Sequence, residues 1–137
     1  RVELAGLPAA LAALPPEPRL LGLDYRRKSP LLDNPPFLQL FAWGQVLRGG
    51  TLNFSFAEFP PSLVVLRDGR RPWSGGLEWY PARLRPDDLR WFDHALVNAP
   101  PDLHDRIAAD PAMTPLTGGG PWRLYRVEPP PAAAPQP

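Results

Sequence analysis

The chain has 137 residues, of which 44% are hydrophobic, and this length and composition suit one domain with a buried core. Lys and Arg number 15 against 14 Asp and Glu, and this balance argues against a nucleic-acid-binding protein, which would carry a basic stripe. The absence of cysteine excludes thiol catalysis, thiolate metal sites and disulfides. The chain has only 2 histidines, His94 and His104, so we expect no metal and no other cofactor.

The two ends of the chain suggest how it is organised. Because it begins at Arg1 rather than at Met, we expect it to be a piece of a longer protein. No run of about 18 apolar residues is present that would span a membrane, and no signal peptide is recognisable. Proline is abundant, with 22 residues, and pairs of prolines separate the apolar segments. We predict a single domain over residues 1–128 and a disordered Pro- and Ala-rich tail over 129–137.

The N-terminal half of the sequence alternates between helical and strand patterns. Leucines spaced by three or four residues predict a helix over 8–14, and the apolar run at 19–25 predicts a buried strand. Apolar residues over 37–47 again follow helical spacing, with Asn34 as the expected N-cap. A strand with one apolar face is predicted at 51–59, where apolar and polar residues alternate.

Two adjacent glycines, Gly49 and Gly50, separate the second predicted helix from this strand. A phosphate-binding glycine loop follows a strand and precedes a helix, so that the first N–H groups of the helix face the anion. Here the order is reversed. We therefore interpret the glycines as a left-handed helix cap rather than a phosphate site. On the strand that follows, Asn53 and Ser55 are expected on the polar face.

The C-terminal half predicts shorter elements. A second apolar run begins at Ser62, and Asp87 and Asp88 indicate the cap of a single helical turn. The remaining predicted elements are a strand at 94–98, a helix at 101–110 and a hairpin of strands near 114–116 and 122–127, the last as the outer strand. This order predicts an α/β fold in layers: a short, mostly parallel sheet with helices packed on it and a C-terminal antiparallel hairpin.

Polar residues at two strand ends are the candidate ligand-binding residues. In open α/β sheets, ligands bind beyond the carboxyl ends of the parallel strands. Asp24 and Tyr25 end the first predicted strand, and Asn98 ends a later one. Together with Arg26 or Arg27, Asp24 could bind a polar ligand. The structural alternative is that Asp24 caps a loop and pairs with an arginine at the surface.

Aromatic residues are the second group of candidates. The segment "PWSGGLEWY" places Trp73, Trp79 and Tyr80 around a pair of glycines. Such rings stack on sugars and also lie at membrane interfaces, so we predict saccharide or interface contacts for them. The alternative is that they cover a small core.

No catalytic residue is predicted. The sequence contains none of the signatures GxSxG, SxxK and HExxH. His94 opens a predicted strand, and its neighbour Asp93 is expected to point to the opposite side. His104 is expected on the polar, solvated face of a helix.

Several stretches over Leu14 to Glu128 together resemble a known kind of domain. In order, they are "LPPEPRLLGLDY", "PPFLQLFAWGQVLRGG", "NFSFAEFPPSLVV", "WFDHALVN" and "GGGPWRLYRVE". They are similar to the soluble C-terminal domain that follows the helical bundle in some bacterial multi-pass membrane proteins. Those proteins are called glycosyltransferase-like and are associated with polyprenyl-phosphate-linked sugars. Their catalytic acids lie in loops of the membrane portion, so the resemblance assigns no catalytic residue here.

The resemblance favours one function among three. The first hypothesis is a non-catalytic accessory domain on the periplasmic or extracytoplasmic face, although the cytoplasm stays open. Its partners would be the membrane portion of the parent chain and a saccharide or lipid-linked sugar, and no nucleic acid. The second is a small stand-alone α/β enzyme, or a nucleotide- or sugar-binding domain, that uses the crevice between Asp24 and Asn98. The third is a protein interaction module with an apolar patch around Trp73 and Trp79.

Overall fold

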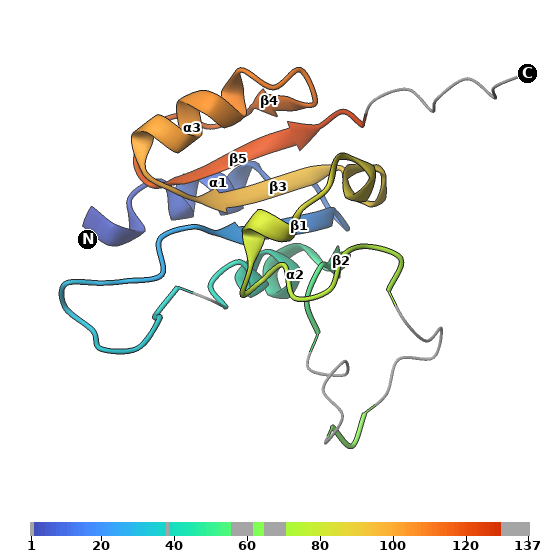
Figure 1. Ribbon diagram of the computed structural model, residues 1–137, viewed down its shortest axis with the longest axis horizontal. Helices are drawn as coiled ribbons and strands as arrows, with labels where there is room; N and C mark the ends of the chain where they lie inside the picture. The colour runs from blue at the N-terminus through green and yellow to red at the C-terminus, as the bar shows by residue number, and fades with distance from the viewer. Residues whose placement is uncertain (1, 38, 56–61, 65–70, 130–137) are drawn as a thin grey trace, which may run out of the picture.

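The sheet at the centre of the fold is open and mixed. The computed structural model describes residues 2–37, 39–55, 62–64 and 71–129. In this part of the chain, five strands lie in the order β2-β1-β3-β5-β4 (Figure 1). They are β1 (Arg19–Asp24), β2 (Thr51–Leu52), β3 (His94–Asn98), β4 (Met113–Pro115) and β5 (Trp122–Val127). The predicted α/β class is confirmed. The expectation of a mostly parallel sheet holds only in part, because β1 pairs parallel with β2 and β3, whereas β5 pairs antiparallel with β3 and β4.

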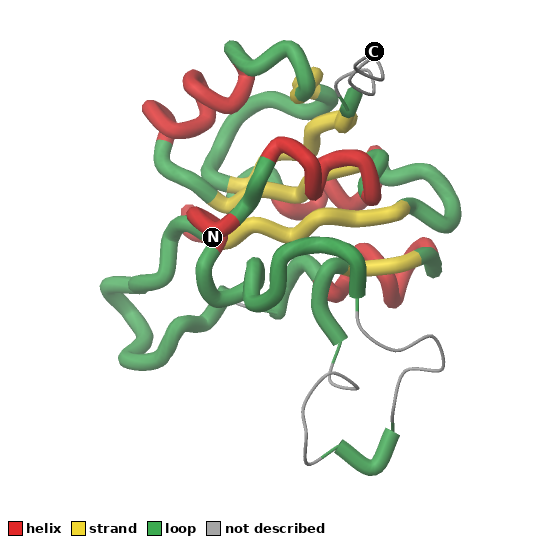
Figure 2. The backbone as a smooth tube through the Cα atoms, turned by 45° about the vertical axis from the view of Figure 1, so that its right-hand side comes forward, coloured by secondary structure: helices red, strands yellow, loops and turns green. Residues whose placement is uncertain are grey.

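Helices cover both faces of this sheet (Figure 2). One face carries α1 (Leu7–Ala13), α2 (Ala42–Arg48) and the short 3-10 helix η1 (Val2–Leu4) that precedes them. The other face carries α3 (Pro101–Ala108) and the 3-10 helices η3 (Pro81–Arg83) and η4 (Pro86–Trp91). The domain is therefore layered, as the sequence predicts.

Alternation along the strands divides the apolar side chains between two cores. On β1, Leu20 belongs to the core beneath α1 and α2, while Leu21 and Leu23 belong to the core beneath α3 and η4. The largest side chains that are fully buried include Phe41 and Trp122 in the first core and Phe92 and Tyr125 in the second.

The second helix begins later than the spacing predicts. It starts at Ala42 with Phe41 as its N-cap, and Asn34 is exposed, so the prediction of Asn34 as the cap is wrong. The segment before the helix turns so that Phe37 and Phe41 are both buried in the first core. Burial of two phenyl rings stabilises this path by more than a few additional helical hydrogen bonds would.

Strand β2 is also shorter than predicted, and Asn53 is not on a polar face. Its side chain is buried, accepts a hydrogen bond from the Gly22 amide at 2.7 Å and donates to the Gly22 carbonyl at 3.2 Å. The Asn53 side chain thus pairs with the backbone of β1 just beyond Leu52, the last residue of β2 in the ladder. Much of the strand predicted at 51–59, and of the apolar run from Ser62, lies outside the described residues.

The later elements agree with the sequence, except for the place of the last strand. The strand at 94–98 and the hairpin are confirmed, and the predicted helix ends at Ala108. Asp88 caps η4, accepting a hydrogen bond from the Arg85 amide at 2.9 Å. The prediction that β5 is the outer strand is wrong: it lies between β3 and β4, with Trp122 and Leu124 buried. The predicted boundary of the tail stays a prediction, since residues 130–137 lie outside the described part.

His104 is buried, contrary to the expectation that it is solvated. Its Nδ1 lies 2.8 Å from the Tyr125 hydroxyl and its Nε2 lies 2.7 Å from the Pro121 carbonyl oxygen. Burial lowers the pKa of the imidazole, because the charged form loses its hydration. With both ring nitrogens bonded, this side chain joins α3 to β5 and has a structural role.

The two glycines after α2 serve backbone geometry, as predicted. Gly49 is the C-cap of α2, with φ 73°, and its amide donates to the Gln45 carbonyl at 2.8 Å. Gly50 follows with φ 79°, and its α-carbon lies against the backbone of Pro18. Both positions have left-handed backbone, which favours glycine.

Alanine at these two positions should therefore destabilise the domain by different amounts. Gly49→Ala has space for a methyl group and should cost only the strain of a backbone with φ 73° and ψ −150°, at least about 1 kcal/mol. At Gly50 the added Cβ would also overlap the Pro18 carbonyl oxygen, so Gly50→Ala should cost about 2 kcal/mol or more. Urea unfolding followed by circular dichroism measures both. Equal losses would show that the contact with Pro18 is not limiting.

Candidate functional site

The structure brings Asp24 and Asn98 together at the carboxyl ends of β1 and β3. They are direct neighbours in the parallel register, and the Asn98 side-chain amide donates to Asp24 Oδ1 at 3.0 Å. The Arg26 backbone amide donates to the same oxygen at 3.1 Å. Both side chains are buried. The pairing of β1 with β3 therefore assembles two of the predicted site residues from positions 74 residues apart.

This pair lies where the chain changes direction across the sheet. The connection after β1 runs to β2 on one side, and β3, the next strand along the chain, lies on the other side of β1 (Figure 1). In open α/β sheets, such a switch point leaves a crevice beyond the strand ends, and ligands bind there.

Three polar atoms, two in the Asp24–Asn98 pair and one in the adjacent Arg26, are buried and have no hydrogen-bond partner. They are Asp24 Oδ2, Asn98 Oδ1 and Arg26 Nη1. Buried polar groups are nearly always hydrogen-bonded in native proteins, so a ligand or water molecule that pairs with these atoms would be favoured. Two are acceptors and one is a donor, which together suit a molecule that carries hydroxyl groups.

The environment of Asp24 also changes its acidity. Burial raises the pKa of its carboxyl group, because the charged form loses hydration. The hydrogen bonds from the Arg26 amide and Asn98, and the charges of Arg27 and Arg26, act in the opposite direction but do not cancel the effect. Tyr25 takes part through its backbone, whose amide donates to the Asn98 carbonyl at 2.8 Å, while its half-buried ring packs against the second core.

Tyr80 lies near the same end of the sheet, and two arginine side chains contact its ring. The guanidinium carbon of Arg27 lies 5.5 Å from the Tyr80 ring centroid, and that of Arg83 lies 4.2 Å from it. Tyr80 is half exposed. No sequence pattern pointed to Arg83, because its place beside the loop after β1 depends only on the tertiary structure.

The other two predicted aromatic contacts differ in their surroundings. Trp73 packs on Phe92 with ring centroids 5.0 Å apart and donates its indole N–H to the Asn53 carbonyl at 3.2 Å. It belongs to the edge of the second core. Trp79 is exposed. Trp73 is therefore partly covered by the core, whereas Trp79 lies at the surface.

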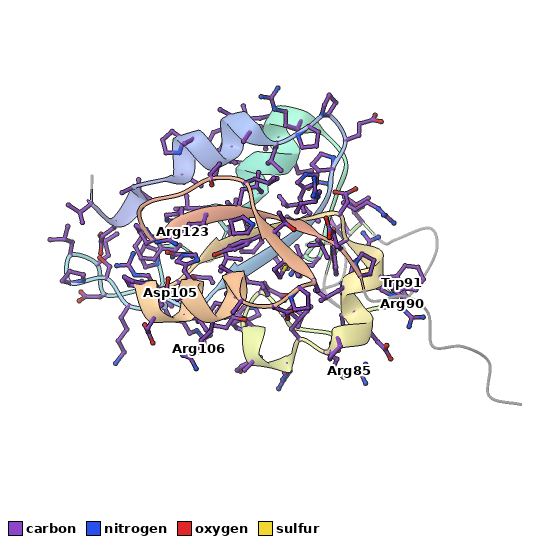
Figure 3. The ribbon with its side chains drawn as sticks, turned by 90° about the horizontal axis from the view of Figure 1, so that it is seen from above. Arg85, Arg90, Trp91, Asp105, Arg106 and Arg123 are labelled. Carbon is purple, nitrogen blue, oxygen red and sulfur yellow. The ribbon has the colours of Figure 1, made fainter. Side chains whose placement is uncertain are left out.

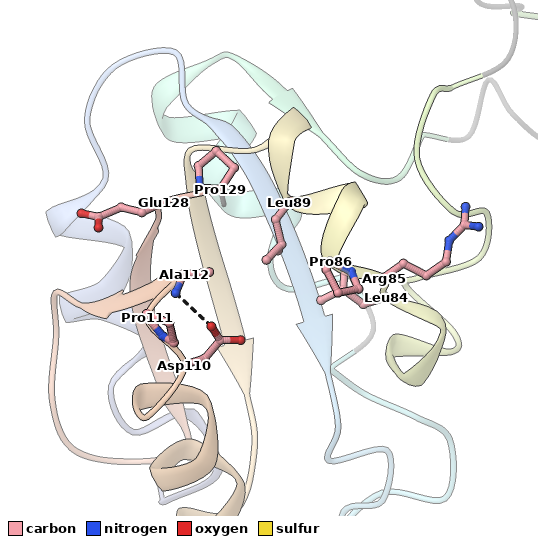
Figure 4. Close-up of a pocket in the computed structure, with 9 residues that line it drawn as sticks. All are labelled: Leu84, Arg85, Pro86, Leu89, Asp110, Pro111, Ala112, Glu128 and Pro129. Carbon is pink, nitrogen blue, oxygen red and sulfur yellow. Dashed lines mark hydrogen bonds between the residues drawn. The ribbon is translucent and has the colours of Figure 1, made fainter. Parts of the chain in front are cut away.

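The hollows of the surface lie in different parts of the domain. One of about 470 Å³, on the loop after β1, is lined by Arg27, Lys28, Ser29, Leu32, Asp33 and Pro35. A groove of about 610 Å³ between α1 and α2 is apolar and includes Leu7, Trp43 and Leu47. A third, of about 590 Å³, lies between η4 and the residues that follow α3 and β5 (Figure 4). The third is at the opposite end of the sheet from Asp24 and contains none of the predicted site residues.

Asp93 and His94 lie at the amino end of β3, away from the candidate site. The expectation that their side chains point apart is wrong, because Asp93 Oδ1 lies 2.7 Å from His94 Nδ1. The same carboxylate accepts hydrogen bonds from the Arg19 amide and, at 3.4 Å, from the Arg19 side chain. This cluster ties β3 to the start of β1.

Within the described residues, no group of three or more His, Asp or Glu side chains is arranged to hold a metal ion. No helix in that part is long and apolar enough to cross a bilayer. Comparisons of the chain with protein-family models, with curated proteins and with solved structures find no match.

Proposed function

We propose that this chain is a non-catalytic accessory domain of a membrane-embedded glycosyltransferase-like protein, and that it binds a saccharide at the carboxyl ends of β1 and β3. The observation that carries the proposal is the set of buried, unpartnered atoms Asp24 Oδ2, Asn98 Oδ1 and Arg26 Nη1 at the switch point of the sheet. Sugar hydroxyls both donate and accept hydrogen bonds, so one ligand could satisfy all three atoms.

The groove between α1 and α2 supports the accessory role. Trp43 and Leu47 are more than half exposed there, and Val46 beside them is 72% exposed. Contiguous exposed apolar side chains of this kind are typical of surfaces that pack on another protein segment. The membrane portion of the parent chain is the occupant that the resemblance implies, on the periplasmic or extracytoplasmic side.

Titration of the 15N-labelled chain with monosaccharides tests the saccharide site. We expect amide shifts to concentrate at Tyr25, Arg26 and Ala99, which flank the unpartnered atoms. Asp24→Asn removes the carboxylate with little change in shape and should weaken binding by about tenfold, since hydrogen bonds to charged groups contribute roughly 1.5–3 kcal/mol. Asp102→Asn, on the exposed surface of α3, is the matched control.

Two results would contradict the proposal. One is an absence of sugar-dependent shifts at the strand ends, and the other is an equal loss of affinity in Asp102→Asn. Sequencing the parent gene is a separate test of the accessory role. The part upstream of Arg1 should encode several apolar runs of about 20 residues. An isolated gene for this domain alone would exclude that role.

A second candidate function is a small enzyme, or a nucleotide- or sugar-binding domain, at the same crevice. The raised pKa of the Asp24 carboxyl favours it, because general acids are often tuned in this way. The same titration samples discriminate the two functions. Product signals that grow with time would indicate an enzyme, and stable binding without product supports the accessory role.

A further inference from the structure

We infer that the strand-end site also contains an oxyanion subsite, formed by Arg27, Lys28 and Arg83 beside Tyr80. The site would therefore select an acidic saccharide, with a carboxylate or phosphoryl group, over a neutral one. This inference rests on the proposed saccharide site and names the class of its ligand.

The first observation is the convergence of two cations on one ring. The guanidinium carbons of Arg27 and Arg83 lie 5.5 and 4.2 Å from the Tyr80 centroid, so they are less than about 10 Å apart. Within the described part of the chain, neither forms a salt bridge with a carboxylate. Two like charges held this close favour an anion between or beside them.

The second observation is the hollow next to Arg27. It has a volume of about 470 Å³, and Arg27, Lys28 and Ser29 line it. Asp33 lines the same hollow and would oppose an anion, but it forms no salt bridge with either cation among the described residues. The hollow is large enough for a monosaccharide acid, and its cations exceed its acids.

The third observation is independent of the surface charges. Arg26 Nη1 is buried and has no hydrogen-bond partner. The guanidinium group presents donors in a planar fork that matches the two oxygens of a carboxylate or phosphoryl group. An oxyanion would therefore suit this atom and the neighbouring Arg27, in competition with the Asp24 carboxyl on which both charges act.

A titration with three ligands tests the inference. Glucose is the neutral reference, and glucuronate and glucose 1-phosphate carry the two forms of oxyanion. In 15N spectra of the 137-residue chain at low salt, we expect at least one acid to bind about tenfold more tightly than glucose, as one charge-assisted hydrogen bond implies. The better acid identifies which oxyanion the subsite accepts. The advantage should shrink as salt is added, because the cations are exposed.

Variants localise the effect. Arg27→Gln and Arg83→Gln should each reduce the advantage of the acid over glucose. Arg106→Gln, which removes an exposed arginine of α3 that pairs with Asp102, is the matched control (Figure 3). If Arg83→Gln fails to fold, Arg27→Gln alone decides the test.

The outcomes separate this inference from the proposed function. Equal binding of all three ligands at the strand ends would overturn the oxyanion subsite and leave the saccharide site standing. An equal effect of Arg106→Gln would overturn it as well. Binding of the acids without any binding of glucose would support the subsite and count against recognition of the sugar ring. No binding of any of the three would overturn both.

Discussion

Gly22→Ala is expected to destabilise the domain by about 3 kcal/mol or more, the upper end of the range for overpacked cores. Gly22 lies in the middle of β1, and a Cβ added there would overlap three carbon atoms of the Phe41 ring. That ring is completely buried in the first core, so it has little room to move. Chemical denaturation followed by tryptophan fluorescence or circular dichroism measures the loss.

A double-mutant cycle identifies the cause. Phe41→Ala alone should cost about 3–5 kcal/mol, because it leaves a cavity. In Gly22→Ala/Phe41→Ala, the new methyl group occupies part of that cavity, so the loss should be clearly smaller than the sum of the two single losses. Gly75→Ala is the control, since no atom lies within 4 Å of its added Cβ. Strict additivity would show that the ring is not what excludes a side chain at Gly22.

Asn98→Asp is expected to destabilise the domain by about 3–5 kcal/mol at neutral pH, because a second buried carboxyl must stay protonated far above its ordinary pKa or be buried as a charge. The new carboxyl would replace an amide that donates to Asp24 Oδ1 at 3.0 Å, and both positions are buried. Two adjacent buried carboxyls cannot both ionise, so one keeps its proton and its pKa rises well above the ordinary value.

The pH dependence provides the diagnostic sign. An acid with a raised pKa in the folded state binds more protons there than in the unfolded state, so stability falls as the pH rises above about 4. Thermal unfolding of Asn98→Asp should therefore show a midpoint that drops between pH 5 and pH 8 by much more than in the parent. Asn34→Asp, at an exposed position, is the control and should follow the parent. Parallel curves for all three proteins would contradict the buried contact between residues 24 and 98.

The site could be predicted from the sequence only in outline. Asp24 and Asn98 end apolar runs, and the rule for strand ends places such residues on one edge of a sheet. That they are direct partners depends on β1 lying beside β3, a pairing of residues far apart in sequence. Arg83 could not be predicted at all, because it ends the short 3-10 helix η3, and no periodic signal in the sequence places that turn beside Arg27.

The sequence by itself determined the elements that depend only on residues close together in the chain. The strand at 94–98, the hairpin at the C-terminus and the cap at Gly49 follow from alternation, turn residues and the left-handed preference of glycine. The tertiary structure alone decided the start of α2, the burial of Asn53 and His104, and the inner position of β5. In each of these cases, contacts between distant segments outweighed the local preference, because burying a ring or satisfying a polar group in the core stabilises more than one residue's propensity does.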